Sequence, residues 1–191
     1  KGGNFDGRNI LSQAFEISAL AAEVGLAPEE MGARIARAKV LLREKRAQRV
    51  PPHRDEKALA DWNGLMLSSM AEAASVLERD DYLEAAIANA KFLTKALYDG
   101  ETLKHSYRDG QAKVKGFLSD YALVCEGLLA LYQATFQGLW LNIAKKLADT
   151  MLEQFWDEGR GHFYDTAHGH ETVLVRPRNI YDNAVPSGSS A

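Results

Sequence analysis

Apolar residues recur at helical spacing along most of the chain, and two of the expected helices are apolar on nearly every side. Residues 62–78 follow Asp61 and contain mostly apolar or small side chains, as do residues 120–136. Such a composition predicts helices that are buried all round. Each is followed by an amphipathic stretch, residues 82–97 and 140–156, with one apolar stripe. The pattern predicts two helical hairpins, each with a buried first helix and a half-exposed second helix.

A further pair of helices is expected nearer the N-terminus. Residues 10–24 carry apolar residues at helical spacing, and Ser12 fits the N-cap position. Pro28 and the two acids after it mark a helix start, and that helix runs to about Gln48. Its polar face is strongly basic, which we interpret as a solvated surface with favourable cations near the helix C-terminus.

The remaining chain is expected to contain two short β-hairpins and the start of one further helix. Residues 103–116 alternate and turn as a β-hairpin does, and residues 162–176 show a second, smaller hairpin pattern. Asp182 is expected to open a third buried helix that the chain barely enters.

The two helical hairpins repeat with an offset of about 58 residues. Tyr82-Leu83 corresponds to Trp140-Leu141, and Trp62 falls opposite Asp120. Neither helix of a repeat can bury its faces alone, so neighbouring repeats must stack. We therefore predict an all-α fold, a partial (α/α) toroid of about three helical hairpins with short β-hairpin excursions. The inner-helix N-termini and the β-hairpins would meet at one mouth of the ring.

Composition excludes several functions. The chain has 191 residues, a net charge of -3 and one cysteine, Cys125, expected in the core. We expect a single domain over residues 1–191, excised from a larger barrel, in a cytoplasmic protein without cofactor or metal. No nucleic acid or membrane partner is expected. Apolar edges left open by excision would favour a homo-oligomer.

The ordered motifs resemble the YyaL-type, spermatogenesis-associated thioredoxin-domain-containing family, in the helical barrel that follows its thioredoxin-like domain. The similarity spans nearly the whole chain. It rests on Asn4-Phe5-x-Gly7-x-Asn9-Ile10-Leu11, Asp55-x-Lys57, Trp62-Asn63-Gly64-Leu65-Met66, Gly116-Phe117-Leu118-x-Asp120-Tyr121-Ala122, Gly127-Leu128-Leu129-x-Leu131-Tyr132, Phe155-x-Asp157 and Asp182-x-Ala184-x-Pro186-Ser187-Gly188.

The resemblance implies a six-hairpin, glycosidase-like or epimerase-like barrel, of which this chain holds roughly the middle. The thioredoxin-like domain of the family is absent from this chain, so the resemblance implies no redox activity for it. Ser189 stands where the family pattern has Asn. The resemblance implies a fold and the domains that accompany it, but no particular reaction.

The candidate site residues are acids at the helix tips and polar or aromatic residues near those tips and in the two hairpins. Paired carboxylates serve glycoside hydrolysis, and histidine serves proton transfer near neutral pH. The candidate catalytic residues are Asp61, Asp120, Asp182 and His105. The candidate substrate-binding residues are Trp62, Asn63, Tyr107, Arg108, Tyr121 and His162.

Two functions remain open at this point. One is a barrel that binds or processes a sugar or another small polar ligand. The other is a non-catalytic scaffold or client-binding module attached to a thioredoxin-like domain. Asp is also a favoured N-cap, so each acid has a structural explanation. Acids that converge on a solvent-filled pocket would favour the sugar site, whereas acids that only cap their own helices would favour the scaffold.

Overall fold

The computed structural model describes residues 3–7, 9–170 and 174–191. The chain divides into two compact units, here called the N-terminal unit, Lys1–Arg54, and the C-terminal unit, Asp55–Ala191. The described residues form six α-helices and two small antiparallel sheets, and each unit is treated separately below.

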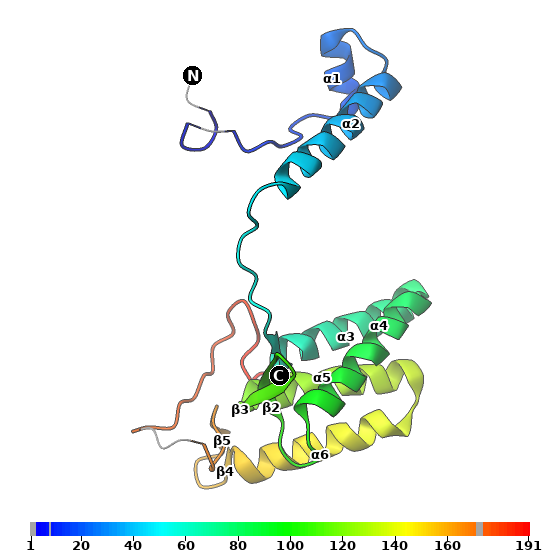
Figure 1. The fold of residues 1–191 in the computed structure, drawn as a ribbon. Helices are drawn as coiled ribbons and strands as arrows, with labels where there is room; N and C mark the ends of the chain where they lie inside the picture. The colour runs from blue at the N-terminus through cyan, green and yellow to red at the C-terminus, as the bar shows by residue number, and fades with distance from the viewer. Residues whose placement is uncertain (1–2, 8, 171–173) are drawn as a thin grey trace. The chain divides into compact units, whose positions relative to one another are not determined.

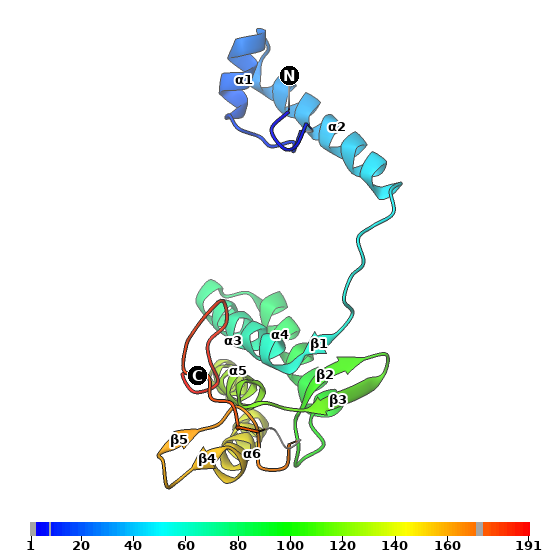
Figure 2. The same ribbon diagram turned by 90° about the vertical axis from the view of Figure 1, so that its left-hand side faces the viewer.

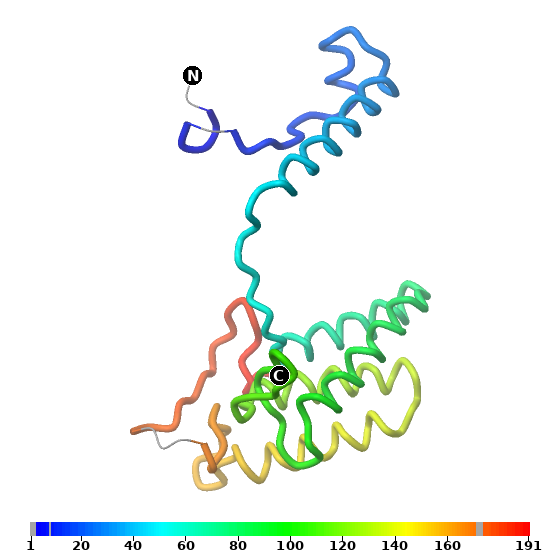
Figure 3. Tube along the Cα trace, viewed as in Figure 1, coloured from blue at the N-terminus to red at the C-terminus, as the bar shows by residue number. Residues whose placement is uncertain are grey.

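The N-terminal unit is a helical hairpin of α1, Ile17–Val24, and α2, Pro28–Ala47. Gly25 ends α1 in the left-handed conformation, as a C-terminal glycine commonly does. The predicted start of the first helix is wrong, because α1 begins at Ile17 and Ser12 caps nothing. Figure 3 shows the extended trace before α1, and the Asn4 side chain bonds both the N–H and the carbonyl of Ile10. Those bonds hold the chain at Ile10 in a non-helical conformation.

The C-terminal unit contains two helical hairpins, as the 58-residue repeat predicts. The helices are α3, Ala60–Leu77; α4, Asp80–Phe92, which continues as the π-helical turn η1, Leu93–Leu97; α5, Leu118–Thr135; and α6, Gly138–Gln154. Glu78 and Phe136 end α3 and α5 in the same left-handed conformation, 58 positions apart. In Figure 1, α5 lies between α3 and α6, and α4 covers α3.

Two glycines let the inner helices α3 and α5 touch through their backbones. A Cβ atom on Gly64 would lie 2.5 Å from the carbonyl carbon of Leu123, and one on Gly127 would lie 2.7 Å from the carbonyl oxygen of Gly64. Real Cβ atoms do not approach so closely. The absence of a side chain at both positions allows this close crossing, which brings the N-termini of α3 and α5 together.

The core of the C-terminal unit surrounds α5. Leu123, Leu128 and Leu131 of α5 are fully buried, Cys125 is buried as expected, and Trp140 and Phe155 pack against the same core. The prediction that α3 is buried all round is wrong, since Trp62 and Met66 are more than half exposed. Helix α5 packs against α3, α4 and α6, whereas α3 packs mainly against α5 and α4.

A three-stranded sheet covers the N-terminal ends of the inner helices (Figure 2). Its antiparallel strands are β1, Ala58–Leu59, β2, Lys104–Arg108, and β3, Gln111–Lys115. The residues of β1 lead directly into α3, and Leu59 pairs with Ser106 of β2. The first predicted hairpin is therefore confirmed, and it lies at the same end as the start of α3.

The second predicted hairpin and the third inner helix need correction. Strands β4, Trp156–Asp157, and β5, His162–Phe163, pair across residues 158–161, so the hairpin begins before the predicted range. The described part of residues 164–176 forms no strand, and residues 171–173 of that prediction lie outside the described residues. No helix begins at Asp182 among the described residues, because its carboxylate accepts the N–H of Ser187 and holds a non-helical turn.

Candidate functional site

Asp120 is the centre of the candidate site. It lies in the first turn of α5, and none of its surface is exposed. One carboxylate oxygen accepts the N–H of Phe117 at 2.8 Å, which closes a capping box at the helix start. The other accepts the backbone N–H of Asp61 at 3.1 Å. The buried carboxylate of Asp120 therefore links the N-termini of both inner helices through hydrogen bonds.

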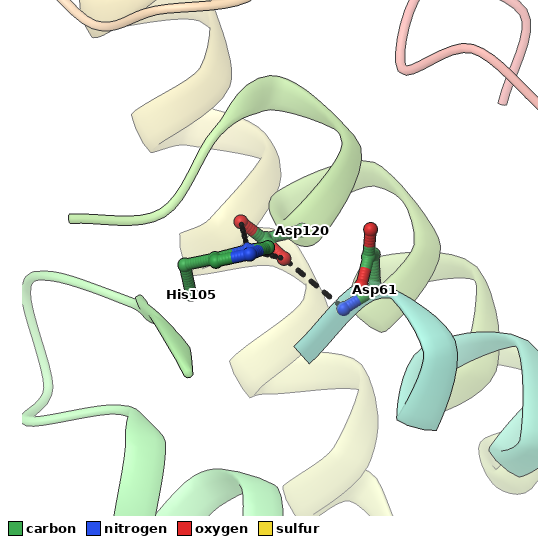
Figure 4. A group of neighbouring side chains, drawn as sticks. All are labelled: Asp61, His105 and Asp120. Atoms are coloured by element: carbon green, nitrogen blue, oxygen red, sulfur yellow. Dashed lines mark hydrogen bonds and ion pairs between the residues drawn. The ribbon is translucent and has the colours of Figure 1, made fainter. Parts of the chain in front are cut away.

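His105 supplies the third partner of this carboxylate. It lies on β2, and its Nδ1 atom is 3.1 and 3.0 Å from the two carboxylate oxygens of Asp120 (Figure 4). This bond raises the pKa of His105 above its usual value, against the opposing effect of partial burial. A neutral His105 that donates from Nδ1 keeps a lone pair on Nε2, and that atom can exchange a proton with a ligand.

Asp61 stands beside this pair with its side chain half-buried. Its carboxylate accepts the N–H of Trp62 at 2.8 Å. Burial, followed by the nearby charge of Asp120, raises the pKa of the Asp61 carboxyl. The ligand-forming atoms of Asp61, His105 and Asp120 all lie within 4.8 Å of one another. The three side chains therefore form one compact cluster.

These three side chains also fit the distances of a metal site, a use the sequence did not predict. Their donor types, two carboxylates and one imidazole, suit a divalent cation. The Asp120 oxygens are already occupied by two backbone N–H groups and by His105. A cation would have to replace the proton between His105 and Asp120, so the hydrogen-bonded pair describes the arrangement better.

A cavity of about 410 Å³ opens next to Asp61. Its lining combines one aromatic ring with carboxylates, amides and hydroxyls. The polar and aromatic lining residues are Asp61, Phe117, Ser119, Asp165, Asn179, Asn183 and Ser187. Its residues come from the starts of α3 and α5 and from the segments around Asp165 and residues 179–188. The starts of α3 and α5, which are far apart in sequence, therefore line one cavity, as the toroid prediction requires.

Asp182 does not join the Asp61–His105–Asp120 cluster. Its carboxylate accepts the N–H of Ser187 at 2.9 Å and the hydroxyl of Ser190 at 2.5 Å. The Ser187 bond lowers the pKa of Asp182. This carboxylate therefore shapes residues 182–190, and those residues form one wall of the cavity. Its predicted catalytic role stays a prediction.

The candidate substrate-binding residues occupy different environments. The Trp62 ring is exposed, whereas the Asn63 amide donates to the carbonyl of Leu59. Tyr121 is buried, and its hydroxyl accepts the N–H of Leu103 at the base of the hairpin. Of the set, Trp62 is the residue with a large free surface close to Asp61.

Three other candidates lie around the two small sheets. Tyr107 packs edge-on against Phe92 at 5.3 Å between ring centroids. Arg108 forms an exposed ion pair with Asp109, and His162 lies against Tyr164 at 4.8 Å. Their roles in binding a ligand stay predictions.

Phe117 was not among the residues predicted for the site. Its ring lies between two imidazoles, 5.2 Å from His105 and 5.5 Å from His170, and it also lines the cavity. Its place in the motif Gly116-Phe117-Leu118, directly before the start of α5, was the available signal. Asp165 was missed as well, and no local pattern in the sequence marks it. Its backbone carbonyl accepts the N–H of Leu118, which brings it to the cavity.

The fold matches part of an (α/α)6 toroid. Cellobiose 2-epimerase from Spirochaeta thermophila DSM 6192 superposes with a TM-score of 0.57 at 24% identity, over 65% of this chain and 32% of that one. Cellobiose 2-epimerase from Bacillus thermoamylovorans B4167 gives a TM-score of 0.56 at 20% identity, over 59% of this chain and 30% of that one. At these identities the likeness concerns the fold.

The chain is a homologue of the spermatogenesis-associated protein 20 family. It is 35% identical to spermatogenesis-associated protein 20 of Homo sapiens over 199 aligned residues, which cover 98% of this chain and 25% of the relative. The chain thus spans about a quarter of the length of that curated relative. No protein-family model matches the chain. None of the described helices has the length and apolar character needed to cross a membrane.

Proposed function

We propose that this chain contributes a carbohydrate-binding and proton-transfer site at the mouth of a six-hairpin barrel. The observation that carries the proposal is the hydrogen-bonded pair of His105 and the buried Asp120, placed beside Asp61 at the tips of two inner helices. In this proposal His105 is the acid/base group, Asp120 positions it, and Asp61 contacts the ligand.

The His105–Asp120 bond suits proton transfer for two reasons. First, a carboxylate on Nδ1 orients the imidazole ring and directs the reactive lone pair to Nε2. Second, the bond to Asp120 raises the pKa of His105 and so favours its protonated form, which can donate a proton to a ligand. Because Asp120 is held by two backbone N–H groups as well, the pair is rigid before any ligand arrives.

The cavity beside Asp61 favours a hydroxylated ligand. Its amide, hydroxyl and carboxylate groups can exchange hydrogen bonds with sugar hydroxyls, and the Phe117 ring offers an apolar edge. No basic side chain belongs to its lining among the described residues, which disfavours a phosphorylated sugar. The structures with a similar fold are named for an epimerase of cellobiose, so a neutral disaccharide is a reasonable first probe.

Calorimetric titration of the purified chain with cellobiose, maltose and glucose tests this function. We expect measurable binding of at least one neutral sugar, weakened about tenfold by Asp61→Asn, which keeps the bond to Trp62. The matched control is Asp149→Asn on the exposed surface of α6, which should leave the affinity unchanged. Equal affinity in both variants would contradict the proposed site.

A non-catalytic scaffold is the second candidate function. The observation that favours it is that Asp61, Asp120 and Asp182 each accept a nearby backbone N–H, at Trp62, Phe117 and Ser187. Hydrogen bonding to the backbone alone would explain the three acids. If no neutral sugar binds and Asp120→Asn affects only stability, the scaffold is the better description.

A further inference from the structure

The N-terminal unit has almost no core of its own. Among its described residues only Ala21 is buried, although the unit contains two helices and many large apolar side chains. Two short helices packed together cannot supply a core that stabilises them in water. Exposed apolar side chains gathered on one face mark a binding surface.

Those side chains line a groove between α2 and the extended segment before α1. The groove has a volume of about 870 Å³, and its apolar floor consists of Ile10, Leu11, Leu20, Ile35 and Leu42. Leu11 is 71% exposed and Leu42 is 51% exposed. Ile35, Ala38 and Leu42 are spaced i, i+3 and i+7, so they form one continuous stripe along α2.

A basic rim follows the apolar stripe. Lys39, Arg43 and Arg46 are spaced i, i+4 and i+7 on α2, and Arg49 continues the line just beyond the helix. Within the described part of the chain, no acid belongs to the groove lining, and no ion pair engages these four cations. Residues 1–54 contain ten basic and six acidic residues, a net charge of +4 for the unit.

We propose that this groove binds an acidic amphipathic helix from another protein. An apolar stripe of the partner would cover the floor, and its carboxylates would pair with Lys39, Arg43 and Arg46 along the rim. A second copy of the chain fits less well, because a symmetric contact would place two basic rims against each other. Nucleic acid would use the rim but leave the apolar floor exposed.

Peptide selection tests the proposal without assuming a partner sequence. A random 16-residue peptide library would be displayed on phage and selected on the immobilised full chain. The most enriched peptide would then be synthesised, and its affinity measured by fluorescence anisotropy. We expect the enriched peptides to carry acids and apolar residues at helical spacing. Raising the salt concentration should weaken their binding, since the rim is exposed.

Two double variants of α2 make the test specific. Arg43→Glu with Arg46→Glu reverses the rim and should weaken binding at least tenfold. Arg37→Glu with Lys45→Glu makes the same change in charge on exposed positions outside the groove, and should change the affinity less than twofold. Circular dichroism checks that both variants keep the helix content of the wild type.

Three results would overturn the proposal. One is a peptide whose affinity falls equally in both double variants. Another is a library that yields only neutral or basic peptides, or no enrichment. The third is tighter binding of single-stranded RNA or of phosphatidylglycerol vesicles than of any selected peptide, with the same dependence on Arg43 and Arg46.

Discussion

Replacement of Asp120 by asparagine is the most informative single change in the C-terminal unit. The buried carboxylate accepts from three donors, the N–H groups of Asp61 and Phe117 and the Nδ1 atom of His105. Asparagine has nearly the same shape but only one acceptor oxygen. Its NH₂ group must therefore face one of the two backbone N–H groups.

The structure sets the size of the effect. If the amide oxygen keeps the Phe117 bond, the N–H of Asp61 loses its acceptor. A buried donor without a partner costs about 1–3 kcal/mol. The remaining bonds lose their charge assistance, which costs about 1 kcal/mol more. We therefore expect Asp120→Asn to lower the free energy of unfolding of the C-terminal unit by about 2–4 kcal/mol.

Urea denaturation followed by tryptophan fluorescence measures this loss. All three tryptophans, Trp62, Trp140 and Trp156, belong to the C-terminal unit, so the signal reports its unfolding. Asp149→Asn on the exposed face of α6 is the matched control and should change stability by less than about 0.5 kcal/mol. If Asp120→Asn is as stable as this control, the assignment of Asp120 as the shared anchor is wrong.

Three further changes test the packing and the titration of the same region. Gly64→Ala places a methyl group against the Leu123 backbone and should cost about 2–3 kcal/mol in urea denaturation, whereas Gly138→Ala, which meets open space, should cost almost nothing. His105→Gln should destabilise more at pH 5.5 than at pH 8.5. Because the folded pKa of His105 is raised, its stabilisation is complete below the unfolded pKa and disappears as the pH rises through the folded pKa. Asp61→Asn should leave stability equal or higher at pH 7, since a raised carboxyl pKa makes the ionised form unfavourable in the fold, and the difference should shrink below pH 4.

The helical repeat could be predicted because its cause is local. Inner and outer helices alternate at 58-residue spacing, and Glu78 and Phe136 end the two inner helices in the same left-handed conformation. The first hairpin was also predictable, from alternation and turn residues between helices. The start of α1 was not, because Asn4 holds Ile10 through bonds that no periodicity reveals.

The residues of the site could be predicted from the sequence, but the hydrogen bonds between them could not. Helix-tip position identified Asp61 and Asp120, and the hairpin identified His105. Their arrangement depends on contacts between distant segments. One carboxylate oxygen of Asp120 accepts the N–H of Asp61, and both of its oxygens lie within hydrogen-bond distance of His105. Asp182 shows the limit of the pattern. It resembles the other tips in sequence, yet its partners are Ser187 and Ser190.

Nitrogen-15 NMR of the histidine side chains measures where His105 carries its proton and whether it meets a sugar. We expect neutral His105 to carry its proton on Nδ1, with a pKa above that of a free histidine, and a bound neutral disaccharide to perturb its Nε2 signal. His53, which is exposed and lies in the other unit, provides the internal reference. A His105 signal with the proton on Nε2, or one that responds to the sugar no more than His53 does, would rule out His105 as the acid/base group held by Asp120.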